Sequence, residues 1–268
     1  MASETVADGL DHPECVIVDR DGSLIAGSES GVIHRIDPAT GATKVIAETG
    51  GFILGLALDD AGSLYICDNG RSQVLRLTEG ELSVYSSGSP HRPMRVPNYA
   101  TFDDAGNLYV SDSGSWGGSD GCIFRIAPGG ETVLFSESTP AFPNGLALSP
   151  DGAHLYVVES LPPAIKRIEL ATVVADIVID LPGAVPDGLA FDVDGGLYIS
   201  CYRPDAIYRL DTNGELSVFS EDPLGTRLAA PTNIAFDGTT LYVANFARWH
   251  LSRLAVPVPG LPLRRPAM

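Results

Sequence analysis

The chain has 268 residues, and its 17 basic and 34 acidic side chains give a formal net charge of −17. This balance argues against a nucleic-acid partner, because phosphate binding requires clustered Lys and Arg. No apolar run approaches the roughly 20 residues that a membrane helix needs. The four cysteines are far apart in the sequence, as in reduced proteins. We therefore expect a cytoplasmic protein with no nucleic-acid or membrane partner.

One sequence phrase recurs six times along the chain. It consists of an apolar strand, an Asp- or Gly-rich turn, and a second strand that usually contains Leu-Tyr. The leucines of the second strands are Leu24, Leu64, Leu108, Leu155, Leu197 and Leu241. A spacing of 40 to 47 residues between strand-type units is typical of one four-stranded propeller blade per repeat. The sequence predicts an all-β fold, a six-bladed β-propeller.

The last repeat lacks a fourth strand, because the segment after Leu254 is too rich in proline to pair well. Residues 3–8 resemble the outer strand of the third repeat. We therefore predict that the N-terminus supplies the outer strand of the last blade and closes the ring, which removes an open sheet edge. The predicted organisation is one propeller over residues 1–255, followed by a Pro-rich tail over residues 256–268. No long unmatched apolar strand stands out, so we expect a monomer.

Polar residues recur at one register of the predicted inner strands. Four residues before the end of each inner strand stand Glu14, Leu54, Asn98, Asn144, Asp187 and Thr232. Two amides and two carboxylates converging on the channel form a hard-oxygen set that suits Ca²⁺ best, with Mg²⁺, Mn²⁺ or Zn²⁺ as alternatives. Taken singly, each residue could instead be a turn cap or a hydrogen-bonded group that fills the channel.

A second repeated position lies four residues after each repeated leucine. It is occupied by Ser28, Asp68, Asp112, Glu159, Cys201 and Asn245. The loops that follow also carry aromatic residues. A mixture of aromatic and polar groups suits a small-molecule site, so we expect substrate contacts from Arg95, Trp116, Glu159, Tyr202 and Trp249.

Four segments resemble the senescence marker protein/gluconolactonase/luciferin-regenerating enzyme family of six-bladed propellers. They are HPECVIVD from His12, RVPNYATFDDAGNLYVSD from Arg95, FPNGLALSPDG from Phe142 and VPDGLAFDVDGGLYIS from Val185. The Phe-Pro-Asn-Gly and Val-Glu-Ser stretches are also similar to strictosidine-synthase-like propellers. The arginine is displaced by one position from the family's usual Arg-x-Asn-Asp stretch, and its aspartate is replaced by Tyr99.

The resemblance implies roles for individual residues. Glu14, Asn144 and Asp187 would bind one catalytic divalent metal ion. Asn98 would contact that metal, its bound water or the substrate, and Asp187 would also act as the general base. The function implied is a metal-dependent hydrolase that opens a lactone or cleaves a related ester of a small molecule.

Two other functions stay open at this point. One is a strictosidine-synthase-like or lyase-type enzyme that uses a pocket carboxylate, for which Glu159 is the candidate. The other is a non-catalytic binding propeller whose metal only stabilises the channel, because a fold does not determine a function.

Overall fold

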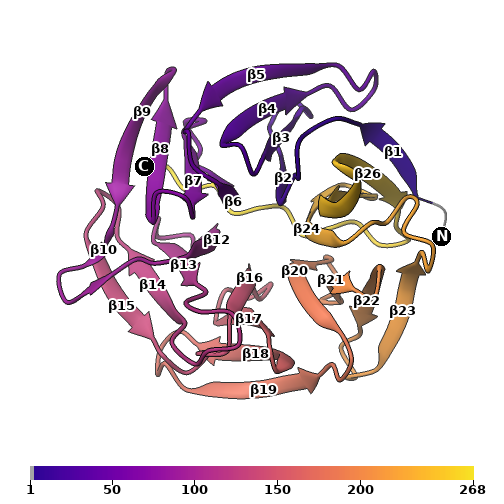
Figure 1. The fold of residues 1–268 in the computed structure, drawn as a ribbon. Helices are drawn as coiled ribbons and strands as arrows, with labels where there is room; N and C mark the ends of the chain where they lie inside the picture. The colour runs from indigo at the N-terminus through magenta and orange to yellow at the C-terminus, as the bar shows by residue number, and fades with distance from the viewer. Residues whose placement is uncertain (1–2) are drawn as a thin grey trace.

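The computed structural model describes residues 3–268, which form six four-stranded antiparallel sheets arranged around a central axis (Figure 1). The prediction of a six-bladed β-propeller is confirmed. Residues 1–2 of the predicted propeller range lie outside the described residues. No helix within residues 3–268 is long and apolar enough to cross a membrane.

The blades follow one another in chain order. Blade 1 consists of β2 (Cys15–Val18), β3 (Leu24–Gly27), β4 (Val32–Ile36) and β5 (Thr43–Glu48). Blade 2 consists of β6 (Ile53–Leu58), β7 (Leu64–Asp68), β8 (Gln73–Thr78) and β9 (Glu81–Ser86). Blade 3 consists of β12 (Pro97–Phe102), β13 (Leu108–Asp112), β14 (Cys122–Ile126) and β15 (Thr132–Ser136). Blade 4 consists of β16 (Pro143–Leu148), β17 (His154–Ser160), β18 (Pro163–Glu169) and β19 (Ala175–Asp180). Blade 5 consists of β20 (Val185–Phe191), β21 (Leu197–Arg203), β22 (Ala206–Leu210) and β23 (Leu216–Glu221). Blade 6 consists of β24 (Pro231–Asp237), β25 (Thr240–Asn245), β26 (His250–Ala255) and β1 (Glu4–Ala7). A short hairpin, β10 (Gly88–Ser89) and β11 (Arg92–Pro93), and the 3₁₀ turn η1 (Phe246–Arg248) complete the fold.

The N-terminal strand closes the ring, as predicted. β1 pairs antiparallel with β26, so the first strand of the chain is the outer strand of the last blade. Glu4 lies opposite Arg253 in this pairing, and their side chains form an ion pair at 2.9 Å. The closure joins the two ends of the propeller by main-chain hydrogen bonds and covers the edge of β26 that would otherwise be open.

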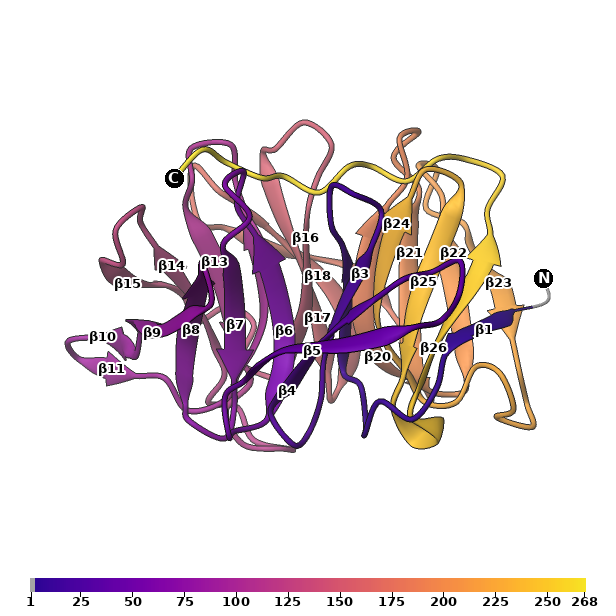
Figure 2. The same ribbon diagram turned by 90° about the horizontal axis from the view of Figure 1, so that it is seen from above.

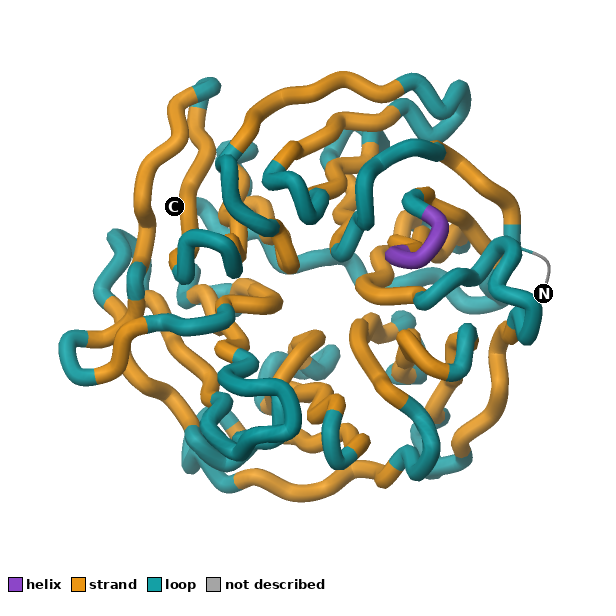
Figure 3. Tube along the Cα trace, in the orientation of Figure 1, coloured by secondary structure: helices purple, strands orange, loops and turns teal. Residues whose placement is uncertain are grey.

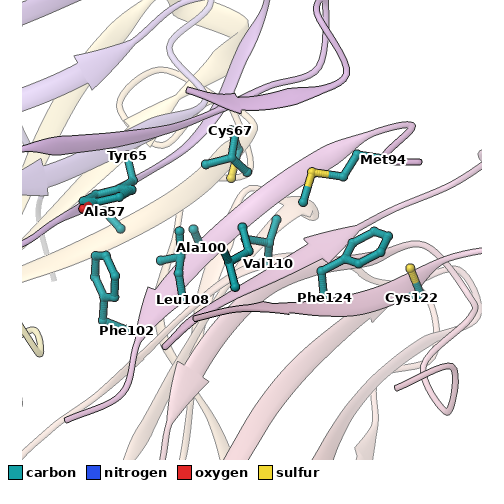
Figure 4. Packing of buried hydrophobic residues seen from close by; sticks show 12 residues of the cluster. Ala57, Tyr65, Cys67, Met94, Ala100, Phe102, Leu108, Val110, Cys122 and Phe124 are labelled. Carbon is teal, nitrogen blue, oxygen red and sulfur yellow. The ribbon is translucent and has the colours of Figure 1, made fainter. Parts of the chain in front are cut away.

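Six apolar clusters hold the ring together, one between each pair of neighbouring blades. Figure 4 shows the cluster between blades 2 and 3, where Tyr65 of β7 stands beside Phe102 of β12. The two rings pack edge to face, with their centroids 5.0 Å apart. The same Tyr–Phe contact recurs between blades 4 and 5 and between blades 5 and 6. The repeated Leu-Tyr phrase therefore supplies a tyrosine that packs on the inner strand of the next blade.

The propeller has two distinct faces. One, the loop face, carries η1 and the loops between the second and third strands of each blade. The other, the turn face, carries the Asp/Gly turns and the C-terminal tail. Figure 2 shows the tail crossing one face while η1 lies at the opposite face, and Figure 3 shows η1 close to the inner strand of blade 6.

The Pro-rich tail is an ordered strap over the turn face. Its main chain bonds to blades 2, 5 and 6: Asp60 N donates to Pro266 O at 2.9 Å, Leu261 N donates to Phe191 O at 2.8 Å, and Gly260 N donates to Gly238 O at 2.8 Å. Its two arginines reach the other three blades, through contacts with Asp104, Ser149, Pro150, Val18 and Asp19. The strap therefore touches all six blades, and it closes the channel over an apolar cavity of about 70 Å³.

Candidate active site

The polar ring predicted at the inner strands is brought together at the loop-face end of the channel. Glu14 directly precedes β2, while Asn98, Asn144 and Asp187 are the second or third residues of β12, β16 and β20. The last three side chains are 6%, 6% and 8% exposed, and Glu14 is partly exposed. Each inner strand begins at the loop face, so its first residues stand where the channel meets solvent.

Two neighbouring members of the ring are in direct contact. Asn144 Nδ2 donates a hydrogen bond to Asp187 Oδ2 at 3.1 Å. This bond fixes the orientation of the amide, and it leaves Asn144 Oδ1 buried without a hydrogen-bond partner. An orphaned buried acceptor costs free energy unless something binds it. Asn98 is oriented differently, since its Nδ2 donates to Ser113 Oγ at 2.9 Å.

Buried serines in or directly after the second strands hold the ring in place. Ser113 Oγ donates to Pro143 O at 2.7 Å, and Ser111 Oγ donates to Asn144 O at 2.7 Å. Ser160 makes the equivalent bond to Pro186 O at 2.9 Å, one blade further on. Each bond runs from one blade to the start of the next inner strand, so the spacing between ring residues depends on it. Sequence analysis missed these serines, because nothing in an isolated strand distinguishes them from other small residues.

Blades 2 and 6 complete the channel differently. Leu54 is apolar, and Thr232 turns its hydroxyl to backbone carbonyls, including Ala244 O at 3.3 Å. Asn233 reaches into the channel instead: its Nδ2 donates to Glu14 O at 2.8 Å and to Leu54 O at 3.2 Å. It thus ties blade 6 to blades 1 and 2, and its Oδ1 is a second buried acceptor without a partner. Asn233 stands one position after the aligned register, which is occupied in this blade by Thr232, so alignment of the inner strands did not identify it.

Burial sets the electrostatics of the two carboxylates. It raises the pKa of Asp187 to about 7, opposed in part by the Asn144 hydrogen bond. The pKa of Glu14 is raised well above its usual range by burial and then by the charges of Asp187 and Glu29. Within residues 3–268, neither carboxylate forms an ion pair with a Lys, Arg or His side chain, whereas His12 is paired with Asp11 and Glu29. Two acids with raised pKa values, Asp187 buried and Glu14 partly exposed, therefore share a site without a compensating cation.

The donor set fits a hard divalent cation. Glu14 and Asp187 supply two negative charges, and Asn144 Oδ1 supplies a neutral oxygen that now lacks a partner. Over the described chain, no three His, Cys, Asp or Glu side chains gather closely enough to bind a metal. A site here therefore depends on the amide oxygens as well as the carboxylates.

The raised pKa of Asp187 predicts a pH-dependent stability in protein stripped of metal by a chelator. The carboxyl group of an unfolded Asp has a pKa of about 3.9. Between about pH 4 and pH 7 the folded protein therefore binds more protons than the unfolded chain. The free energy of unfolding must then fall as pH rises through this window. We expect Asp187→Asn to be more stable than wild type at pH 8 but not at pH 4, measured by denaturant unfolding in chelator. An identical pH dependence in the two proteins would contradict this assignment.

Glu159 is held by a different set of contacts. It is buried, and its Oε2 lies 2.7 Å from Lys166 Nζ while its Oε1 accepts the Ala141 N–H at 2.9 Å. Other members of its repeated position make equivalent bonds. Asp112 accepts from Arg95 N and Val96 N, and Asn245 Oδ1 accepts from Ala229 N. This second ring therefore caps the segments that lead into the inner strands.

The remaining candidates lie at the loop face. The Arg95 guanidinium contacts the Asp120 carboxylate and Ser115 Oγ. Trp116 is 60% exposed and meets the Phe142 ring edge-on at 4.8 Å. Trp249 is 45% exposed, and Tyr202 stands 6.1 Å from the Phe246 ring.

Solved structures with this architecture include three from related propellers. The gluconolactonase XC5397 from Xanthomonas campestris has a TM-score of 0.82 at 20% identity, covering 95% of this chain and 89% of that one. Regucalcin from Agrobacterium tumefaciens, a calcium-binding protein, has a TM-score of 0.83 at 19% identity, covering 100% and 98%. A luciferin-regenerating enzyme has a TM-score of 0.82 at 16% identity, covering 100% and 99%. At these identities the likeness concerns the fold.

A search of curated protein sequences found no significant match. A family profile, by contrast, matches residues 12–246, which include all six inner strands and every member of the polar ring. That profile is described as the SMP-30/Gluconolactonase/LRE-like region. With its fold and most of its length matched, this six-bladed propeller belongs to the SMP-30/gluconolactonase/LRE-like family.

Proposed function

We propose that the protein is a divalent-metal-dependent hydrolase that opens a lactone or cleaves a related ester of a small molecule. The observation that carries the proposal is the pair of acids with raised pKa values, Glu14 and Asp187, beside the unpartnered Asn144 Oδ1. Carboxylates are rarely left buried without a counter-charge. Family membership supports lactone chemistry, since gluconolactonases are among the similar proteins.

The ring residues have two proposed roles, metal binding and proton transfer. Glu14, Asn144 and Asp187 would hold one ion, most suitably Ca²⁺, with Asn98 beside it. Such an ion would supply Lewis-acid polarisation of the substrate carbonyl and would balance its developing negative charge. Because Asn98 and Asn144 are neutral, two carboxylates formally balance a divalent ion, and the site keeps its attraction for an oxyanion.

Asp187 is the proposed general base. One of its oxygens, Oδ2, accepts the Asn144 amide, which fixes the plane of the carboxylate. Its other oxygen, Oδ1, would take a proton from an attacking water. Glu14 comes from the far side of the ring and acts in binding rather than in proton transfer.

The pocket-carboxylate alternative has weaker support. Glu159 already engages Lys166 and a backbone N–H, so proton transfer by it would first require these bonds to break. A non-catalytic binding propeller remains the alternative outcome of the test below. We further propose that the protein acts as a cytoplasmic monomer; its four cysteines are free and buried.

The test combines metal analysis with a panel of lactones and esters. We expect about one divalent ion per chain, and activity that is lost on chelation and restored by metal. Glu159→Gln serves as the discriminating variant and should retain turnover. Full activity in chelator together with loss of activity in Glu159→Gln would reject the metal mechanism in favour of the Glu159 site. Bound metal without turnover of any substrate would favour the binding propeller.

A further inference from the structure

A collar of apolar residues precedes the polar ring at the loop face. Two residues before each ring position the chain carries, in blade order, His12, Phe52, Val96, Phe142, Val185 and Ala230. Five of the six are apolar. All except Ala230 are partly exposed, so their side chains are not completely packed against the rest of the protein. The collar therefore lies directly before the ring at the start of each inner strand.

Two aromatic groups extend the collar outward. Above blades 3 and 4, Trp116 packs edge-on against Phe142 of the collar at 4.8 Å. Above blades 6 and 1, His12 of the collar lies 4.8 Å from the Phe246 ring and 4.7 Å from the Trp249 ring. Each group contains one strongly exposed tryptophan. Exposed aromatic surface that is continuous with a binding site marks a place where apolar ligand surface is buried.

The charged side chains that the sequence offered for substrate contact are engaged elsewhere. Arg95 contacts Asp120 and Ser115, and Glu159 contacts Lys166. Recruiting either to a substrate hydroxyl would first break an ion pair. A polyhydroxylated ligand would thus place hydroxyl groups against phenyl and isopropyl side chains, and a desolvated hydroxyl without a hydrogen bond is costly.

We propose that the substrate is a lactone or ester with apolar alkyl or aromatic substituents, rather than a sugar lactone. This inference rests on the proposed function, since it assigns the substrate class of the same site. The collar receives the apolar substituent, and the two aromatic groups flank it, while the carbonyl lies over the ring of Glu14, Asn144 and Asp187. The apolar surroundings also exclude water from the substituent.

The chain is well suited to a direct binding test, because it contains only two tryptophans and both belong to these groups. Single-tryptophan proteins, Trp116→Phe and Trp249→Phe, report binding at one group each through fluorescence. The probes are γ-dodecalactone, which is apolar, and glucono-δ-lactone, which is polar. Titrations in chelator measure binding without turnover, and kcat/KM is then measured with metal.

We expect γ-dodecalactone to change the emission of both single-tryptophan proteins with a Kd at least about tenfold lower than glucono-δ-lactone. Its kcat/KM should exceed that of the sugar lactone by about a hundredfold or more. Trp116→Ala should raise KM for γ-dodecalactone and leave kcat nearly unchanged. Ile177→Ala, which removes an exposed apolar side chain from the outer strand β19, is the matched control and should change neither.

The outcomes separate this inference from the function on which it rests. Tight binding of γ-dodecalactone without hydrolysis supports the apolar site while the hydrolase proposal fails. Equal or better hydrolysis of glucono-δ-lactone overturns the apolar assignment while the hydrolase proposal stands. Fluorescence that does not respond to γ-dodecalactone in either single-tryptophan protein also overturns it.

Discussion

Asp187→Asn is expected to lower kcat by about 10²–10⁴-fold, the usual contribution of a positioned general base. The amide keeps the shape of the side chain but cannot accept a proton from water. Because an amide oxygen can still bind a hard cation, the variant should retain most of its metal. Steady-state kinetics with the best lactone of the panel, combined with metal analysis of the same sample, measures both quantities.

Asp180→Asn is the matched control for this prediction. Asp180 is exposed at the end of β19, so the substitution removes the same charge without touching the ring. We expect unchanged kinetics. If Asp187→Asn keeps more than about a tenth of the wild-type kcat while metal is bound, the base lies elsewhere. If it loses metal together with activity, its role is limited to binding the ion.

Removing the strap is expected to cost at least about 3 kcal/mol of unfolding free energy. Truncation after Val256 deletes the main-chain bonds to Asp60, Phe191 and Gly238 and both arginine contacts. It also exposes apolar residues at the channel floor, including Phe191 and Phe236. Burial of one or two such side chains accounts for an effect of this size. For a chain of this length the midpoint of thermal unfolding should fall by about 6 °C or more.

Deletion of only the last two residues, 267–268, is the control, because both are exposed and Pro266 O keeps its bond to Asp60 N. This shorter deletion should leave the midpoint within about 2 °C of wild type. The longer truncation should also increase the fluorescence of an apolar dye that binds the uncovered floor. A midpoint that does not move after truncation at Val256 would show that the six blades hold together without the strap.

Most of the architecture could be predicted from local patterns. Strand alternation, the Asp/Gly turns and the Leu-Tyr phrase repeat within each blade, and each acts over a few residues. The pairing of the N-terminal strand with the last blade was also predictable, because the last repeat lacks an outer strand and residues 3–8 resemble one. The strap was predicted only as a Pro-rich tail, since proline content says that it pairs poorly with strands but not where it lies.

The site was predictable in register but not in contacts. Glu14, Asn98, Asn144 and Asp187 occupy equivalent positions of repeated strands, so the sequence itself determined that they share one end of the channel. Only the tertiary structure decided that Asn144 turns its amide to Asp187 and leaves Oδ1 unpartnered, that Glu159 is held by Lys166, and that Asn233 bonds to Glu14 O across 219 residues of chain. The physical reason is range: turn and strand signals act between near neighbours, whereas these hydrogen bonds form only after separate blades have packed into a ring.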